Sequence, residues 1–371
     1  MFLPLAHALA RVVQMVSIQT GGTLAFWSGD SRRLVEDVGA AKPTHFPSVP
    51  RVFEKIHARV LARGEQGSAV KQRLFSWAIA TGRKARPALR ADDASAALKA
   101  QYALADRLVL SKVRELFGGR LELALTGAAP IPGEVLEFLD ACGITVLEGY
   151  GMTETCAAAT LNPPNDPRFG TVGPRLRGTD VRIADDGEIL LSGANVFKGY
   201  HRNDEATRDL FEGEAVRTGD LGELDDGYLR ITGRKKDLII TSSGKNISPT
   251  NIENALRESR WISQAVVYGD NRSYLVALLT LDAEEAADLA AELGINGDVP
   301  AMAGNPQVRE ALQRDVDAAN SRFARIEQVK KFTVLEQDLS QEAGELTPTM
   351  KVKRAVVEKR YADTFGELYD G

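Results

Sequence analysis

The sequence predicts an α/β protein. We expect part of a large N-terminal α/β domain, in which a parallel sheet with helices carries a small β-rich subdomain, followed by a small α+β C-terminal domain. Three observations support this fold class: a strand–helix–strand pattern, a later run of short strands and turns, and a final set of strands and capped helices. The length of 371 residues also exceeds that of one average domain.

The strand–helix–strand pattern begins with an apolar strand at residues 121–125 and a tight loop at 126–129. Pro132 stands where the first turn of a helix would begin, and Gly143 ends that helix. A second apolar strand follows at residues 144–147. Because a single helix connects the two strands, they should be parallel.

Two loops are expected to meet at one edge of this sheet. Residues 126–129 follow the first strand, and residues 150–155 follow the second. The carboxyl ends of neighbouring parallel strands lie at the same edge, where open α/β sheets bind ligands. We therefore expect the two loops to line one ligand-binding crevice.

Periodicity and turn signals assign the other segments. Residues 52–117 have apolar residues at three- and four-residue spacing, typical of two or three amphipathic helices, with breaks near Gly64 and at Pro87. Asp-Gly pairs at 186–187 and 226–227 predict hairpin turns of the β-rich subdomain.

A domain boundary is expected between residues 234 and 235, which gives a large domain at 1–234 and a small one at 235–371. In the small domain, Ser248 followed by Pro249 predicts the start of a helix. The small domain should therefore contain its own strands and capped helices.

Composition and charge exclude several classes of protein. The chain has 46 Lys and Arg against 51 Asp and Glu, a net charge of -5, which argues against binding nucleic acid through bulk charge. Cys142 and Cys156 cannot make a disulfide framework, and no Cys/His cluster has zinc-ligand spacing. No apolar stretch reaches the roughly 20 residues that span a bilayer. We therefore expect a reduced, cytoplasmic protein, and the sequence leaves open whether it touches the inner membrane face.

Six short motifs occur in a fixed order along the chain. They are Tyr150-Gly-Met-Thr-Glu-Thr155, Gly187-Glu188 with Gly193 and Gly199-Tyr200, Arg217-Thr-Gly-Asp-Leu221, Gly233-Arg-Lys-Lys-Asp237, Ser243-Gly-Lys-Asn246 and Thr349-Met-Lys351. Together with residues 3–7 and 46–53, these motifs resemble the adenylate-forming acyl-CoA synthetases, specifically the long-chain fatty acid–CoA ligases. The resemblance covers essentially the whole chain.

The resemblance implies an ATP-dependent reaction in two steps. A long-chain fatty carboxylate attacks the α-phosphate of ATP in the presence of Mg²⁺, giving acyl-AMP and pyrophosphate, and coenzyme A then displaces AMP. The implied nucleotide-binding residues are Gly127, Tyr150, Gly151, Thr153, Asp220 and Arg234. Among them, Tyr150 would stack on adenine and Asp220 would bind the ribose hydroxyls. Without the resemblance, Asp220 is an ordinary turn residue and Arg234 a solvated surface residue.

The resemblance also implies a set of catalytic residues: Lys351, Thr153, Glu154 and His7. Thr153 would contact the α-phosphate, Glu154 would hold Mg²⁺, and Lys351 would stabilise the adenylation transition state. The family glycine that precedes the lysine is Met350 here. On local grounds alone, Lys351 is a solvated lysine near a helix start, and His7 is a core histidine.

Three further residues of the small domain are assigned by the resemblance. Lys236 lies at the hinge about which the small, mobile domain would rotate between the two steps, and Gly244 and Lys245 lie in the stretch that would form the pantetheine passage for coenzyme A. The alternative interpretations are one lysine of a solvated basic run and a plain hairpin turn.

The family also carries a Ser/Thr/Gly-rich phosphate loop upstream of residues 3–7, and the sequence contains no such loop. We therefore expect this chain to be a partial copy, and inactive in isolation. Two other functions stay open: a fatty acyl-AMP ligase that loads a carrier protein, and a non-catalytic nucleotide-binding remnant. Acyl chain length and oligomeric state are not fixed by the sequence.

Overall fold

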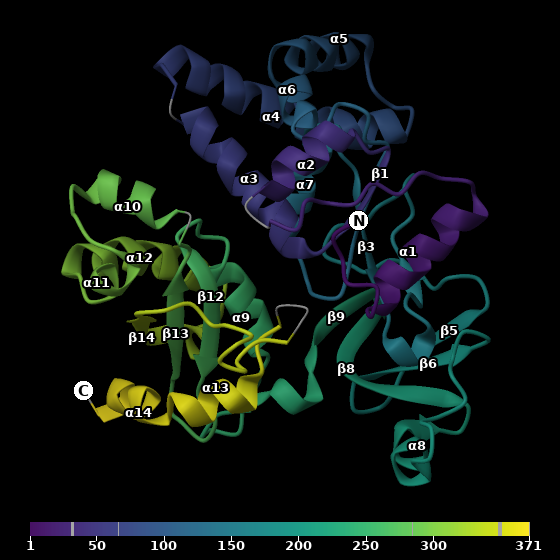
Figure 1. Ribbon diagram of the computed structural model, residues 1–371, viewed down its shortest axis with the longest axis vertical. Coiled ribbons are helices and arrows are strands. Elements are labelled where there is room, and N and C mark those ends of the chain that lie inside the picture. The colour runs from purple at the N-terminus through teal and green to yellow at the C-terminus, as the bar shows by residue number, and fades with distance from the viewer. Residues whose placement is uncertain (31–32, 66, 284, 348–350, 371) are drawn as a thin grey trace. The chain divides into compact units, whose positions relative to one another are not determined.

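The computed structural model describes residues 1–30, 33–65, 67–283, 285–347 and 351–370. The chain divides into two compact units, Met1–Ile231 and Thr232–Gly371, which are described separately (Figure 1). Within the described residues, no helix is both long enough and apolar enough to cross a membrane.

The first unit is built on a small sheet in the strand order β1-β2-β3-β4. The strands are β1 (His45–Ser48), β2 (Leu123–Thr126), β3 (Val146–Tyr150) and β4 (Thr160–Leu161). The parallel pairing of β2 with β3 is confirmed, and β1 pairs parallel with β2 on the other side. The sequence did not predict β1, because Pro47 lies inside it. As β1 is an edge strand, its missing amide hydrogen is tolerated there.

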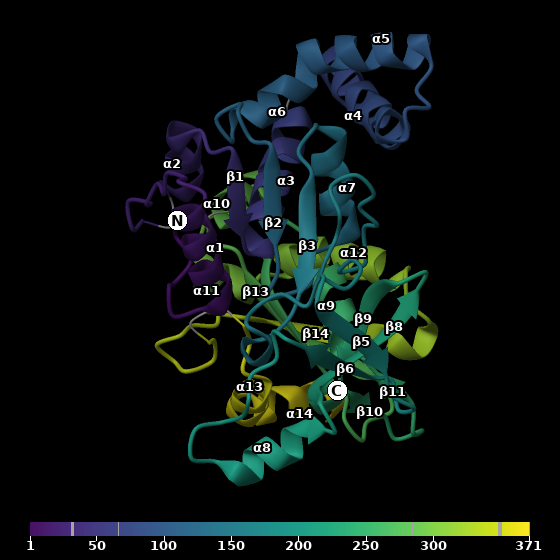
Figure 2. The ribbon, with the colours of Figure 1, turned by 90° about the vertical axis from the view of Figure 1, so that its right-hand side faces the viewer.

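The first unit also contains helices, the last of which packs against the second sheet described below. They are α1 (Ala8–Gln19), α2 (Leu34–Ala41), α3 (Pro50–Glu65), α4 (Ala69–Arg90), α5 (Ala96–Ala105), the π-helical segment η2 (Asp106–Leu110), α6 (Ser111–Glu115), α7 (Gly133–Ala141) and α8 (Asp204–Leu210). Figure 2 shows β1, β2 and β3 side by side, with α4, α5 and α6 beyond the ends at which β2 and β3 begin. The opposite, carboxyl ends of these strands carry the predicted loops.

The predicted helix break at Pro87 is wrong, because α4 continues through it to Arg90. Packing against α7 explains the continuation. A Cβ at Gly82 would lie 2.3 Å from the carbonyl oxygen of Ala141, so the two helices are in close backbone contact. One turn beyond Pro87, Arg90 Nη1 donates to the buried Asp140 Oδ1 at 2.6 Å. These contacts compensate for the single helical hydrogen bond that proline removes.

A second sheet of the first unit has the order β5-β6-β8-β7, with β9 paired to β8. Its strands are β5 (Thr179–Ile183), β6 (Glu188–Gly193), β7 (Phe211–Glu212), β8 (Ala215–Asp225) and β9 (Tyr228–Arg234), of which β9 runs on into the second unit. Both predicted hairpin turns are present. Asp226 and Gly227 have φ of 49° and 79°, the left-handed values of a tight two-residue turn.

The second unit combines a three-stranded sheet in the order β12-β13-β14 with a short hairpin. Its strands are β10 (Ile239–Ile240), β11 (Asn246–Ile247), β12 (Ile262–Tyr268), β13 (Leu275–Leu281) and β14 (Val329–Leu335). Its helices are α9 (Pro249–Leu256), α10 (Ala286–Leu293), α11 (Val299–Ala303), α12 (Pro306–Asn320), α13 (Arg354–Arg360) and α14 (Ala362–Asp370). One apolar cluster packs the four helices α9, α10, α11 and α12 against the sheet. Another packs α13 and α14 against it. The predicted α/β class with a final α+β part is thereby confirmed.

Ser248 occupies the N-cap position of α9, as the sequence predicts, with Pro249 as the first helical residue. Within the described residues, however, its side chain makes no cap hydrogen bond. A Cβ at Gly233 would lie 2.8 Å from Ser248 Oγ, so the hydroxyl is packed closely against that glycine.

Candidate active site

The carboxyl ends of β2 and β3 bring the two predicted loops together. Thr126 and Glu148 are Cα partners in the parallel ladder, so the loops that follow them begin at one edge of the sheet. At this edge, a Cβ at Gly127 would lie 3.0 Å from the carbonyl oxygen of Gly149. Only a residue without a side chain permits this approach comfortably. The structure thus places Gly127 directly beside the strand that leads to Tyr150.

The turn after β3 depends on Gly151. A Cβ there would lie 1.7 Å from the carbonyl oxygen of Ala157, so any other residue would force the loop to open. The short 3-10 turn η3 (Thr153–Thr155) follows, and the Met152 N–H donates to Thr155 Oγ1 at 3.0 Å. This turn leaves Thr153 exposed and fixes the position of Glu154 next to it.

Tyr150 and Asp220 are in direct contact although 70 residues separate them. Tyr150 Oη donates to Asp220 Oδ2 at 2.7 Å. Tyr150 ends β3 in the parallel sheet, whereas Asp220 belongs to β8 in the other sheet and is 7% exposed. Two residues that the sequence assigns to one nucleotide site therefore meet in the structure.

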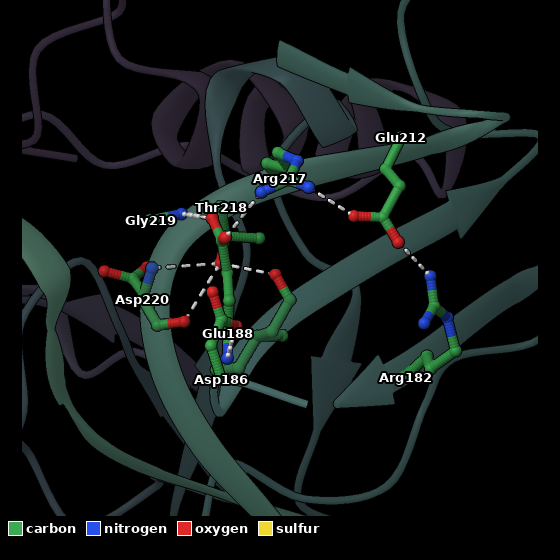
Figure 3. A network of polar contacts seen from close by, with 9 residues as sticks. Arg182, Asp186, Glu188, Glu212, Arg217, Thr218, Gly219 and Asp220 are labelled. Atoms are coloured by element: carbon green, nitrogen blue, oxygen red, sulfur yellow. Dashed lines mark hydrogen bonds and ion pairs between the residues drawn. The ribbon is translucent and has the colours of Figure 1, made fainter. Parts of the chain in front are cut away.

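A network of polar contacts holds the segment that carries Asp220 (Figure 3). Glu188 on β6 is buried, and its carboxylate accepts from the Gly219 N–H at 2.9 Å and from Arg217 Nη1 at 3.4 Å. Arg217 also pairs with Glu212 at 2.5 Å. Gly219 has φ of 71°, and the pairing of β6 with β8 shifts register at this point. The resulting bulge turns Asp220 away from the regular ladder.

Glu154 is held by a tyrosine from another part of the chain. Tyr200 Oη donates to Glu154 Oε1 at 2.7 Å, and the Phe197 N–H donates to the Glu154 carbonyl oxygen at 2.8 Å. This hydrogen bond to Glu154 raises the pKa of Tyr200 to about 12. Within the described part of the chain, no three His, Cys, Asp or Glu gather as a metal cluster. A lone carboxylate suits Mg²⁺ that keeps water and substrate phosphates as its other ligands.

Glu148 was not assigned a role by the sequence, yet it is the buried carboxyl nearest to Tyr150 along β3. Burial raises the pKa of Glu148 to about 8, although a backbone hydrogen bond from Ile131 opposes this effect. On β2, the hydroxyl of its partner Thr126 is buried and has no hydrogen-bond partner among the described residues. The edge of the sheet is therefore lined by polar groups out of contact with water.

The raised pKa of Glu148 predicts a pH-dependent stability. The folded state keeps a proton that the unfolded state releases between about pH 4.5 and pH 8, so the free energy of unfolding should fall as pH rises through this window. Glu148→Gln should remove this dependence and gain about 1–3 kcal/mol at pH 8, because a neutral amide replaces a buried charge. Thermal melts from pH 5 to pH 8 measure it, with the exposed Glu137→Gln as the control. Parallel pH profiles for wild type and Glu148→Gln would contradict the assignment.

The other predicted residues belong to elements other than β2, β3 and β8. His7 is the half-buried N-cap residue of α1 in the first unit. Arg234, at the end of β9, and Lys236, in the 3-10 turn η4 (Lys235–Asp237), are exposed and belong to the second unit. Gly244, with φ of 79°, and the exposed Lys245 lie in the turn between β10 and β11, also in the second unit.

Lys351 lies in the polar segment before α13. Its N–H donates to Thr347 Oγ1 at 3.0 Å, and the Thr347 N–H donates back to the Lys351 carbonyl oxygen at 2.8 Å. Thr349 and Met350 of the same motif lie outside the described residues. The start of α13 is anchored to the sheet, because Arg354 Nη1 donates to the Val267 carbonyl oxygen at 2.7 Å.

The sequence analysis assigned no role to three candidate functional residues: Glu148, Glu188 and Tyr200. Glu188 and Tyr200 stand in the recognised motifs, so their motif membership was the available signal. Glu148 precedes the Tyr150 motif by one glycine, and a charged residue at the end of an apolar strand was its signal. The contacts of these residues could be identified only from the tertiary structure.

Family profiles cover both units of the chain. The profile of the AMP-binding enzyme family matches residues 1–201, and that of the AMP-binding enzyme C-terminal domain matches residues 236–371. The chain belongs to the AMP-binding enzyme family. The predicted resemblance to adenylate-forming enzymes is confirmed.

Several relatives of this AMP-binding enzyme are long-chain fatty acid–CoA ligases by name. It is 40% identical over 372 residues to long-chain-fatty-acid–CoA ligase FadD15 of Mycobacterium bovis, and all of this chain matches 62% of that protein. It is 34% identical to long-chain-fatty-acid–CoA ligase 5 of Rattus norvegicus, of which it matches 55%. The chain thus spans less than two thirds of the length of these relatives.

Solved structures of low identity share the fold of this AMP-binding enzyme. The adenylation domain of a carboxylate reductase from Mycobacterium chelonae matches the whole chain with a TM-score of 0.76 at 22% identity, over 53% of its own chain. O-succinylbenzoate coenzyme A synthetase from Bacillus subtilis, solved with ATP and magnesium, matches 96% of this chain and 60% of its own, with a TM-score of 0.60 and 22% identity.

Proposed function

We propose that the protein is a long-chain fatty acid–CoA ligase that forms AMP, acting through an acyl-AMP intermediate. The observation that carries the proposal is the Tyr150–Asp220 hydrogen bond of 2.7 Å at the carboxyl edge of the parallel sheet. It joins an aromatic ring and a carboxylate, the two groups that an adenosine needs for its base and its ribose. The names of relatives at 34% to 40% identity support fatty acids as the substrate class.

In this proposal, the first unit binds the nucleotide and the acyl group. Tyr150 stacks on adenine, Asp220 accepts hydrogen bonds from the ribose hydroxyls, and Thr153 contacts the α-phosphate. Gly127 and Gly151 allow the loops at the edge of the sheet to pack closely, because a side chain at either position would meet backbone at 3.0 Å or less.

Mg²⁺, when bound, would neutralise phosphate charge during attack by the fatty carboxylate. Glu154 is the proposed ligand, and Tyr200 orients its carboxylate through the 2.7 Å hydrogen bond. His7 is proposed to line the carboxylate site. Arg234 is proposed to reach the ribose or phosphate.

The second unit is proposed to serve both steps. Lys351 stabilises charge during adenylation, and Lys236 is the hinge residue. Gly244 and Lys245 line the coenzyme A passage in the thioester step, where the left-handed turn at Gly244 lets a ligand approach the backbone. The proposed location is the cytoplasm, since both described cysteines are free thiols, as reducing compartments favour.

An assay of the complete enzyme, which includes the phosphate loop of the family, with palmitate, ATP, Mg²⁺ and free coenzyme A tests the function. We expect palmitate-dependent AMP release that is matched mole for mole by palmitoyl-CoA. AMP release with no palmitoyl-CoA, but with acyl transfer to a carrier protein, would favour an acyl-AMP ligase instead. Nucleotide binding without any palmitate-dependent AMP would contradict both enzymatic functions.

A further inference from the structure

A groove with a volume of about 430 Å³ lies between α3, α4 and α7, and it is not part of the candidate active site. Its walls are mainly apolar: Leu61 of α3, Phe75 and Ile79 of α4, and Phe138 of α7 contribute to it. His57 also lines it, with its ring 4.6 Å from that of Phe138. The volume is within the range of small-molecule sites, which are typically apolar with a few polar groups.

Close packing shapes one wall of the groove. A Cβ at Gly64 would lie 2.7 Å from the ring of Phe75, so the ring packs directly against the glycine of α3. Burial lowers the pKa of His57 to about 4, which keeps the imidazole uncharged at neutral pH. The lining beneath the rim is therefore free of formal charge.

The rim of the groove is charged, with two cations and one carboxylate. Arg83 and Lys84 are exposed on α4, and Glu134 is exposed on α7. Arg83 lies 3.8 Å from Glu134, and both side chains are about half exposed, so this pair is weak. An anion at the rim could replace Glu134 as the partner of Arg83, and Lys84 supplies a second positive charge.

The helices around the groove carry a net positive charge in an otherwise acidic chain. Together, α3, α4 and α7 contain 10 Lys and Arg against 5 Asp and Glu, with six of the cations on α4 and only acidic charges on α7. The remaining residues contain 36 Lys and Arg against 46 Asp and Glu. The net positive charge of these helices, most of it on α4, favours an anionic ligand.

We infer that this groove binds a free long-chain fatty acid, with the acyl chain along the apolar walls and the carboxylate at Arg83 and Lys84. The groove residues belong to α3, α4 and α7, whereas the candidate active site is formed by the loops after β2 and β3 and by β8. The site is therefore a second acyl-binding site, beyond the proposed reaction, and its binding needs neither ATP nor Mg²⁺.

Binding of a dansyl-labelled fatty acid to the full chain tests this inference. In the absence of nucleotide, fluorescence should rise on binding, and palmitate should displace the probe. Hexadecanol, which lacks the carboxylate, and acetate, which lacks the chain, should displace it much less. Equal displacement by hexadecanol would overturn the role of Arg83 and Lys84.

Variants locate the bound molecule. Arg83→Ala with Lys84→Ala should raise the dissociation constant about tenfold, because two cationic partners of the carboxylate are lost. Ala80→Trp, from an exposed position on the groove wall, should block the chain and abolish the fluorescence rise. Arg73→Ala, an exposed arginine of the same helix outside the lining, is the matched control and should bind normally.

Different results would contradict the proposed reaction and fatty acid binding in the groove. If Tyr150→Ala removed probe binding while the Arg83 and Lys84 double variant kept it, the fatty acid would occupy the adenylation site, and the groove would be excluded. If the groove variants lost binding but, in the complete enzyme, kept palmitate-dependent AMP release, the inference and the proposed function would both stand. Near-UV circular dichroism of Ala80→Trp and of the double variant confirms that each is folded; unaltered binding by both folded variants would overturn the inference.

Discussion

Replacing Lys351 by alanine should slow acyl-AMP formation by about 100-fold or more, because Lys351 is proposed to supply a positive charge where the transition state gathers negative charge. The reaction of coenzyme A with preformed acyl-AMP should keep nearly its normal rate, since the proposed role of Lys351 is confined to adenylation. The measurement uses the complete enzyme. It compares palmitate-dependent ATP–pyrophosphate exchange with palmitoyl-CoA formation from synthetic palmitoyl-AMP.

The matched control is Lys353→Ala, two residues along the same segment. Lys353 is the N-cap residue of α13, and no cap hydrogen bond from its side chain is seen in the described structure. Its replacement should leave both steps largely intact. If Lys351→Ala slowed the two steps equally, or left adenylation unchanged, the assignment would be wrong and Lys353 would become the candidate.

Replacing Asp220 by alanine should weaken AMP binding by about 10- to 100-fold, as expected when hydrogen bonds to a carboxylate are lost. Asp220 is 7% exposed and is held by the bulge at Gly219, so its carboxylate has a fixed position, as its proposed role of binding the ribose hydroxyls requires. Isothermal titration calorimetry with AMP measures the effect. Asp225→Ala, an exposed carboxylate on the same strand, should bind AMP normally.

A tyrosine variant separates two roles of Asp220. Tyr150→Phe keeps the ring that would stack on adenine but loses the 2.7 Å hydrogen bond to Asp220. Its affinity for AMP should therefore fall by much less than that of Asp220→Ala. An equal loss in both variants would mean that Asp220 only orients Tyr150 and does not itself bind the ribose.

Local sequence signals predicted elements whose cause is itself local. Pro132 and Gly143 bracket α7 (Gly133–Ala141), since proline suits a helix start and a left-handed glycine suits its end. The Asp-Gly pair at 226–227 adopts the left-handed turn that links β8 to β9. In both cases, the backbone preference of one or two residues determines the structure.

Other elements depended on partners distant in the chain. β1 contains Pro47, so its sequence pattern did not predict a strand. The segment forms a strand because it pairs with the otherwise free edge of β2. α4 passes Pro87 because Gly82 and Arg90 contact α7, more than 40 residues away. A prediction from local preference fails at such places, because tertiary contacts outweigh the cost of one missing hydrogen bond.

The sequence by itself determined the fold class, the order of the motifs and the family, because these follow from periodicity, turn residues and short patterns. The tertiary structure alone decided that Tyr150 contacts Asp220, that Tyr200 holds Glu154, and that an apolar groove opens between α3, α4 and α7. These features join residues tens of positions apart. Their geometry is set by how sheets and helices pack, which no local pattern in the chain encodes.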